Sequence, residues 1–178
     1  MAASSSVSAA DLAALEALLN EFFAGQTSND RKREIEQVLA HFGEQTNAWH
    51  QCLGFLAATK DNHFVSMFVL TTLETIIRRK WIGMPGNEKA EIRSQLNEYL
   101  IKRHDSIPSY IRNKAIKLIV DIAASDWPHF YPDFFTNLLD LLRRKETLIV
   151  GLNMLLITSE ELATPRDNVS SSRREELK

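Results

Sequence analysis

Apolar residues recur at three- and four-residue steps along most of this chain. This spacing places them on one face of an α-helix and predicts helices almost throughout. The same steps return in seven later segments, and no segment has the strict alternation of a half-buried strand. We therefore expect an all-α fold. In the first segment the apolar face consists of Leu12, Leu15, Leu18, Leu19, Phe22 and Phe23.

Several helix ends carry sequence signals. Ser8 followed by Asp11 has the spacing of a capping box, which predicts the start of the first helix. Gly25 suits the end of that helix, because glycine adopts the left-handed backbone common after a helix. Asn62 is expected to cap the fourth helix. Pro108 is expected in the first turn of the sixth.

The most informative stretch spans residues 108–135, where a helix meets two prolines. An amphipathic helix is expected to end near residue 124, and Asp126 is expected to cap the next one, beginning at about Pro128. Large aromatic side chains, Trp127 and Phe130, are expected to pack at this joint. We assign a structural role in this corner to Trp127, Pro128 and Pro132.

The helices group in pairs, at about 9–43, 48–82, 87–124 and 126–163. The later pairs recur at a period near the roughly 40–47 residues of HEAT and armadillo repeats. We therefore expect a right-handed α-solenoid of about four repeats. A four-helix bundle or an irregular all-α domain remains an alternative. Residues 1–8 are expected to be a flexible amino terminus, and residues 166–178 the start of a further repeat.

The eighth helix, from about Thr147 to Leu162, has almost no polar face. A helix that is apolar all round needs neighbours on several sides. A solenoid also needs a polar terminal cap, which this sequence lacks. We therefore expect the chain to be the first part of a longer protein.

Composition narrows the classes of function. The net charge of -2 gives no overall electrostatic case for binding nucleic acid or an anionic membrane. Cys52 is the single cysteine, so no internal disulfide is possible and a reducing compartment is favoured. No secretion signal or membrane-spanning stretch is recognisable.

Enzyme motifs are missing from the sequence. There is no glycine-rich phosphate loop and no histidine pair at metal-binding spacing, so we expect no catalytic residue, cofactor or metal. His50 and Cys52 lie two positions apart, which points them to different faces of a helix. A helical enzyme with a Cys–His site formed through space is a rival hypothesis. A buried core thiol is the simpler interpretation of Cys52.

Polar stripes remain on two of the second helices of the pairs. Asn113, Lys117 and Asp121 recur at four-residue steps opposite the apolar face of the sixth helix. The fourth helix has a similar stripe that includes Thr71 and Arg78. Such stripes can be ordinary solvated faces. In a stack of helix pairs, however, second helices line the concave surface on which a partner protein binds.

Several separate blocks resemble the amino-terminal region of importin-β-type nuclear transport receptors, and exportins in particular. The resemblance begins near Leu12 and covers essentially the rest of the chain. The Trp-Pro corner is its family-level feature. The blocks that carry the resemblance are residues 31–36, 110–114, 119–122, 126–128, 130–132, 133–137, 158–163 and 165–166.

The resemblance implies a right-handed superhelix of HEAT repeats that binds the small GTPase Ran in its GTP form. In the family, second helices of the early repeats contact Ran. Carried onto this sequence, that surface falls on Glu34, Gln37, Thr71, Glu74, Arg78, Asn113, Lys117 and Asp121.

The resemblance also implies further partners and a location. Phe-Gly nucleoporins bind the outer face of such receptors, and the cargo implied here is a protein of the actin–profilin class. The receptor would shuttle between nucleus and cytoplasm. The family tends to be acidic, whereas this segment is only mildly so, which does not support strong charge steering of Ran. A generic HEAT-repeat scaffold with no role in transport is the alternative.

Overall fold

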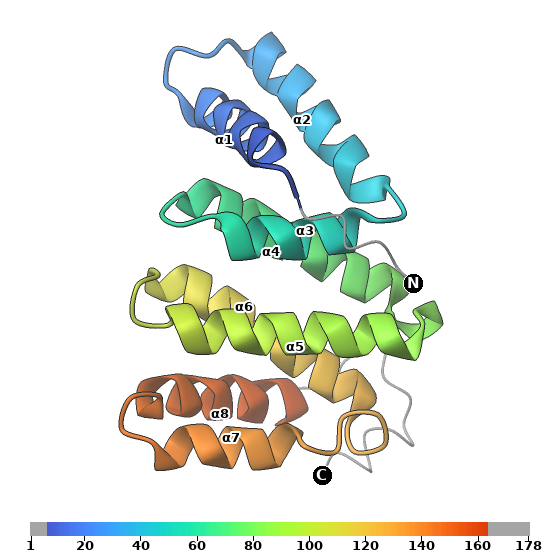
Figure 1. The fold of residues 1–178 in the computed structure, drawn as a ribbon, viewed down its shortest axis with the longest axis vertical. Helices are drawn as coiled ribbons and strands as arrows, with labels where there is room; N and C mark the ends of the chain where they lie inside the picture. Colours follow the sequence, from blue (N-terminus) through green and yellow to red (C-terminus); the bar gives the residue numbers. More distant parts are fainter. Residues whose placement is uncertain (1–6, 164–178) are drawn as a thin grey trace. The chain divides into compact units, whose positions relative to one another are not determined.

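The computed structural model describes residues 7–163 of the chain (Figure 1). Within these residues there are eight α-helices and one short 3-10 helix, and no strand. This confirms the all-α prediction. The chain divides into two compact units, Met1–Gln95 and Leu96–Lys178. The start of a further repeat expected over residues 166–178 lies outside the described residues.

The first unit packs its helices around a common apolar core. α1 contacts α2 and α4, while α3 packs along α4. Its elements are α1 (Ala9–Phe23), α2 (Asn29–Glu44), α3 (Ala48–Ala58), α4 (His63–Lys80), the 3-10 helix η1 (Trp81–Gly83) and the first half of α5 (Gly86–Arg103). The core residues include Leu15, Leu19, Ile35, Leu53, Val65, Val69, Leu70 and Leu73.

The second unit contains the second half of α5 and the helix α6 (Ser109–Asp126). α7 (Phe134–Arg143) and α6 both pack against α8 (Leu148–Ala163). The core face predicted for the sixth helix is confirmed, because each of its residues is essentially inaccessible to solvent. These residues are Ile111, Ala115, Leu118, Ile119 and Ile122.

Two of the predicted caps are confirmed. The Ser8 hydroxyl accepts a hydrogen bond from the Asp11 N–H, and the Asp11 carboxylate accepts one from the Ser8 N–H, which completes the capping box. The Asn62 side chain accepts hydrogen bonds from the Phe64 and Val65 N–H groups at the start of α4. Both caps satisfy N–H groups that have no partner within the helix.

The expectation for Gly25 was wrong. α1 ends at Phe23, and the chain leaves it through Ala24 in an extended conformation. The Ala24 N–H and the Thr27 hydroxyl both donate to the Glu21 carbonyl, so the helix end is satisfied without a left-handed residue. No glycine in the described residues has a positive φ. Pro108 is the N-cap of α6, one position earlier than predicted.

The boundary predicted for the seventh helix was also wrong. α6 continues to Asp126, which is buried at its last turn and does not cap α7. α7 begins only at Phe134. The reason is that a residue preceding proline avoids helical backbone angles, and Pro128 and Pro132 impose this twice in succession. The intervening residues form turns, and the Trp127–Pro128 peptide bond is cis.

The prediction that Phe130 packs at this joint was wrong. Phe130 is 71% exposed, whereas its neighbour Tyr131 is buried. The Tyr131 ring packs against Phe134, and its hydroxyl accepts a hydrogen bond of 3.1 Å from the Asn97 side-chain amide. Tyrosine can be buried here because its hydroxyl finds this partner.

α8 is buried on one side only. Val150 and Met154 pack into the second unit, where α8 meets α6 and α7. Its other face is apolar and solvent-exposed within the described residues, so the polar outer face of an ordinary surface helix is missing. The exposed residues of this face are Leu148, Ile149, Leu152, Leu155 and Leu156.

Candidate protein-docking surface

In the first unit, the carboxyl-terminal end of α2 approaches the middle of α4. The Phe42 ring on α2 is 6.0 Å from the Phe55 ring on α3 and 5.9 Å from the Phe68 ring on α4. Gly43 approaches α4 so closely that a Cβ placed on it would be 3.5 Å from the Thr72 methyl group. Because of these contacts, the polar stripes of α2 and α4 both belong to the first unit.

Most of the residues predicted for the docking surface in this unit are accessible. Gln37 on α2 and Thr71 and Arg78 on α4 are exposed, and Glu74 is half-buried. No ion pair holds Arg78 within the described residues, so its guanidinium is available to a partner.

Glu34 is exposed but already paired. Arg31 donates hydrogen bonds to Glu21 on α1 and, at 2.9 Å, to Glu34 one turn further along α2. The hydrogen bond to Glu21, followed by that to Glu34, raises the pKa of the Arg31 guanidinium. The hydrogen bond from Arg31 lowers the pKa of Glu21. Glu34 can therefore contact a partner only while sharing its charge with Arg31.

In the second unit the polar stripe of α6 meets α8. Lys117 donates hydrogen bonds to Asp121, at 3.4 Å, and to Glu161 on α8. Burial disfavours the charged ammonium, but the hydrogen bond to Glu161 and the two nearby carboxylates outweigh this effect and raise the pKa of Lys117. Only 13% of the Asp121 side chain is exposed. Asn113, one turn before Lys117, is exposed.

Glu161 was missed by reasoning from the sequence. It lies 44 positions from Lys117, so no periodicity within one helix links the two residues. The sequence could have indicated this pair only through the predicted pairing of helices, in which α6 and α8 are the second helices of consecutive pairs. That placement brings their polar faces together.

The described residues were searched for side chains that could bind a metal ion. No group of three or more His, Cys, Asp or Glu side chains between residues 7 and 163 is arranged to hold a metal ion. Among the helices of this same region, none combines the length and hydrophobicity needed to cross a bilayer. The exposed stripes instead offer hydrogen-bonding groups and charges of both signs, which suit recognition of another protein.

Cys52 is a core thiol. It is fully buried, and burial raises the pKa of its thiol to about 12. The His50 ring packs edge-to-face on Trp49, and its Nε2 lies 3.8 Å from a carboxylate oxygen of Glu91. In the part of the chain that the structure describes, no hydrogen bond joins His50 to Cys52. The thiol is thus poorly suited to act as a nucleophile.

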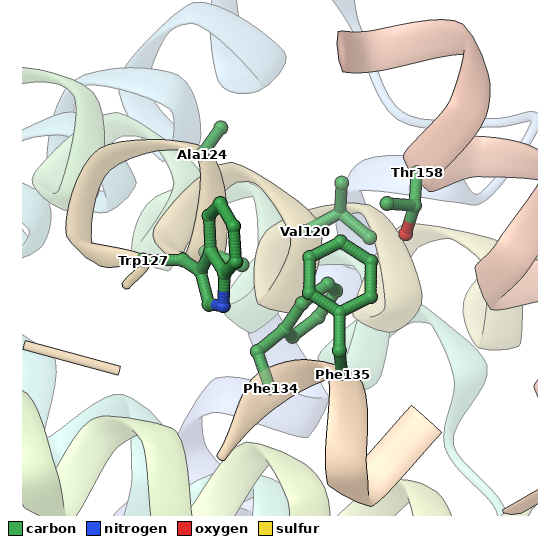
Figure 2. Close-up of a pocket in the computed structure, with 7 residues that line it drawn as sticks. Val120, Ala124, Trp127, Phe134, Phe135 and Thr158 are labelled. Carbon is green, nitrogen blue, oxygen red and sulfur yellow. The ribbon is translucent and has the colours of Figure 1, made fainter. Parts of the chain in front are cut away.

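A small apolar cleft lies in the second unit, where α6, α7 and α8 meet. Figure 2 shows Trp127 and Phe135 beside it, with Val120 from α6 and Thr158 from α8. The two aromatic rings are 5.1 Å apart in an edge-to-face arrangement. The cleft holds only about 10 Å³, which is the space of one water molecule. We interpret it as a packing feature of the corner.

Two families match this chain. The family described as importin-beta N-terminal domain matches residues 35–102, and the family described as exportin 1-like protein matches residues 108–178. Together these matches cover most of the helices that carry the predicted docking residues.

Individual relatives agree with this result. Exportin-6 of Mus musculus and exportin-6 of Homo sapiens are each 50% identical to this chain over 169 residues, and exportin-6 of Danio rerio is 46% identical over the same length. Each match covers 95% of this chain. The chain spans about 15% of the length of each of these relatives.

Proposed function

Because the chain belongs to the exportin family and is similar to the amino-terminal region of exportin-6, we propose that it is part of a nuclear export receptor. In this proposal, the exposed polar faces of its second helices bind Ran in the GTP form. The consecutive helix pairs α1/α2, α3/α4, α5/α6 and α7/α8 would be its HEAT-type repeats.

The main support is the coincidence of family match and exposed surface. Gln37, Thr71 and Arg78 lie within the importin-beta N-terminal match and are exposed, and Glu74 is half-buried beside them. Asn113 lies within the exportin 1-like match and is also exposed. A surface with charges of both signs and hydrogen-bonding groups suits a polar protein partner.

The proposed residues would contribute in different ways. Arg78 and Asn113 would bind the partner directly, because both are exposed. Lys117 and Asp121 form an intramolecular network with Glu161. They would therefore interact with Ran through the combined charge of the three side chains. We therefore expect substitution of Arg78 or Asn113 to affect affinity more specifically than substitution of Lys117, which also weakens α6–α8 packing.

The proposed mechanism is linkage and involves no bond chemistry by this protein. Ran-GTP and cargo would each raise the affinity of the receptor for the other, with a coupling free energy typically of about 1–3 kcal/mol and equal in both directions. A high concentration of Ran-GTP in the nucleus would favour loading. Hydrolysis of GTP by Ran in the cytoplasm would remove the favoured partner and release the cargo.

The identity of the partners is proposed from the resemblance to exportins. The cargo would be a protein of the actin–profilin class, and Phe-Gly nucleoporins would carry the receptor through the nuclear pore. Such a receptor would shuttle between nucleus and cytoplasm. Cargo contacts can lie anywhere in the whole protein, of which this chain spans a small part.

The test is a binding titration of the chain with Ran locked in the GTP form and with Ran-GDP. We expect clear preference for the GTP form, by about tenfold or more. Equal affinity for both forms would favour the generic HEAT-repeat scaffold, and absence of binding to both would remove Ran from the proposal for this segment.

Variants locate the surface. We expect Arg78→Glu and Asn113→Ala each to weaken binding of Ran-GTP without lowering the thermal stability of the chain. Arg144→Glu is the matched control for Arg78→Glu, because Arg144 is an exposed arginine outside the proposed surface. An equal loss in Arg144→Glu would indicate a nonspecific charge effect.

A further inference from the structure

The connection between α5 and α6 exposes a serine hydroxyl beside an arginine. Ser106 is exposed and lies three positions after Arg103, whose Nε donates a hydrogen bond of 3.1 Å to the Ser106 hydroxyl. We propose that Ser106 is a phosphorylation site for a protein kinase that selects arginine three positions before its target, and that the phosphate then stabilises this connection. The proposal concerns the second unit alone and does not depend on Ran binding.

The sequence offers few sites of this kind. Among all its serines and threonines, Ser106 and Thr147 are the two that follow an arginine by three positions. Kinases of this class select substrates by charge pattern, because carboxylates in the substrate groove of the kinase bind the arginine of the target. The spacing alone therefore leaves two candidates.

The structure separates these two candidates by burial. Thr147 is 7% exposed, and its hydroxyl donates a hydrogen bond of 2.9 Å to the Leu141 carbonyl. A kinase cannot reach this hydroxyl while the chain is folded. Ser106 lies in an exposed turn, and 87% of the side chain of its neighbour Asp105 is exposed. Of the two hydroxyl groups, the one on Ser106 is accessible.

The turn must open while the kinase acts, because the substrate groove of a kinase binds an extended segment. Two backbone hydrogen bonds close the turn. The Arg103 carbonyl accepts them from the Ser106 N–H, at 2.9 Å, and from the Ile107 N–H, at 3.1 Å. A connection held in this way opens at a lower free energy than a packed helix. Ile107 is buried, which favours closure of the turn after the reaction.

The reaction takes its phosphate from ATP. The Ser106 oxygen attacks the γ-phosphorus, a P–O ester bond forms, and the bond between the γ-phosphorus and the bridging oxygen of ADP breaks. ADP leaves with the electron pair of the broken bond, and the serine proton passes to the catalytic aspartate of the kinase. Ser106 thereby gains about 1.5 to 2 negative charges.

The Arg103 guanidinium is already placed to bind this phosphate. Phosphorylation removes the hydroxyl hydrogen that Ser106 donates to the Arg103 carbonyl at 3.1 Å. That carbonyl keeps its two N–H donors, so it remains satisfied. In exchange, the phosphate oxygens accept charge-assisted hydrogen bonds from the guanidinium, which are stronger than hydrogen bonds between neutral groups.

The start of α6 adds to this attraction. Pro108 is the N-cap of α6, no side chain caps the first turn, and that turn contains no acidic residue. The first N–H groups of a helix carry partial positive charge, which a nearby phosphate offsets. Ser106 lies two positions before Pro108, so its phosphate is close to this end of the helix.

A neighbouring turn supplies further cations. The His104 Nε2 lies 2.9 Å from the Glu146 carbonyl, so the α5–α6 and α7–α8 turns lie side by side in the second unit (Figure 1). Arg144 and Lys145, which precede Glu146, are exposed and form no ion pair within the described residues. Asp105 is the opposing charge in the α5–α6 turn, and its exposure allows solvent and salt to screen it.

The experiment incubates the whole chain with ATP and the catalytic subunit of cAMP-dependent protein kinase, and mass spectrometry locates the phosphate. We expect one phosphate on Ser106 and none on Thr147. Arg103→Ala should lower the rate of incorporation by about tenfold or more, because the kinase loses the charge that it recognises. Ser109→Ala should leave the rate unchanged, since Ser109 is an exposed serine that follows no arginine at this spacing.

Thermal melting of the phosphorylated and unmodified chains tests the stabilising effect. We expect the phosphorylated chain to melt about 2–4 °C higher at low salt. This gain should shrink at about 1 M salt, because salt screens exposed ion pairs.

Each measurement has an outcome that would overturn the proposal. Absence of phosphate on Ser106, or incorporation that continues undiminished in Ser106→Ala, would remove the site. An unchanged rate in Arg103→Ala would show that the kinase does not recognise this arginine. A melting temperature that stays the same or falls after phosphorylation would show that the phosphate does not stabilise the connection.

Discussion

The Lys117 ammonium on α6 hydrogen-bonds the carboxylate of Glu161 on α8, a residue 44 positions further along the chain. Asp121, one turn after Lys117 on α6, provides a second carboxylate. Two polar faces that the sequence presents separately thus form one charged network in the second unit. The network holds polar side chains of α6 and α8 against each other.

We expect Glu161→Gln to lower the free energy of unfolding by less than about 1 kcal/mol at pH 8, because the Lys117 side chain is partly exposed and solvent weakens its ion pairs. Burial acts against the charged form of Lys117, but the carboxylates raise its pKa in the folded state. Its contribution is therefore fully present below the unfolded lysine pKa of about 10.4 and is lost as the pH rises through the higher folded value.

The measurement is a set of urea titrations of both proteins from pH 8 to strongly alkaline pH. The difference between the two proteins should shrink at the alkaline end. Glu146→Gln serves as a control, since its side chain is exposed and forms no ion pair within the described residues. A difference that grows above pH 10.4 would contradict the assigned role of Lys117.

Trp127→Ala tests the corner between α6 and α7. The sequence-based expectation for a fully buried indole is a loss of about 3–5 kcal/mol. Trp127 is only half-buried, and it packs edge-to-face on Phe135 at 5.1 Å. We therefore expect the free energy of unfolding to fall by about 2 kcal/mol in a denaturant titration, counting the lost burial and the aromatic pair.

Phe130→Ala is the matched control for the corner, because Phe130 is three residues away and 71% exposed. We expect this variant to change the free energy of unfolding by less than about 0.5 kcal/mol. Equal losses in the two variants would show that burial of Trp127 does not stabilise the corner.

Two glycines inside helices should respond oppositely to alanine. A Cβ on Gly151 of α8 would lie 3.0 Å from the backbone nitrogen of Leu142 in α7, and a backbone atom cannot move aside as easily as a side chain. The strain should exceed the gain of about 1 kcal/mol in helix propensity. We expect Gly151→Ala to lower the free energy of unfolding by about 1 kcal/mol or more.

Gly43→Ala provides the comparison. A Cβ there would meet only the Thr72 methyl group at 3.5 Å, an ordinary contact distance. We expect the free energy of unfolding of this variant to be unchanged or higher by up to about 1 kcal/mol. Both glycine variants are measured by thermal and urea denaturation. A stabilised Gly151→Ala would mean that α7 and α8 can separate at little cost.

Cys52 should resist alkylation in the folded chain. Its thiol is fully buried, and burial raises its pKa to about 12, so very little thiolate forms at pH 8. We expect iodoacetamide to modify Cys52 only when denaturant unfolds the chain, as followed by mass spectrometry. Rapid modification under native conditions would instead support the hypothesis of a reactive Cys–His site.

The sequence by itself determined the helices and several of their ends. Apolar spacing identified the buried face of α6, and local hydrogen-bonding rules identified the caps at Ser8 and Asn62. These features are predictable because they depend on residues within one or two turns of each other. The blocks resembling exportins likewise required only the order of residues.

Tertiary structure decided which aromatic side chain of the corner is buried and which charges pair. Phe130 and Tyr131 look equally suitable in the sequence, but only Tyr131 has both a packing surface on Phe134 and a hydrogen-bond donor in Asn97. Similarly, Lys117 forms a hydrogen bond with Glu161 only because α8 packs against α6. Such contacts join residues that are distant in the chain, and the helical period contains no information about which distant residues will meet.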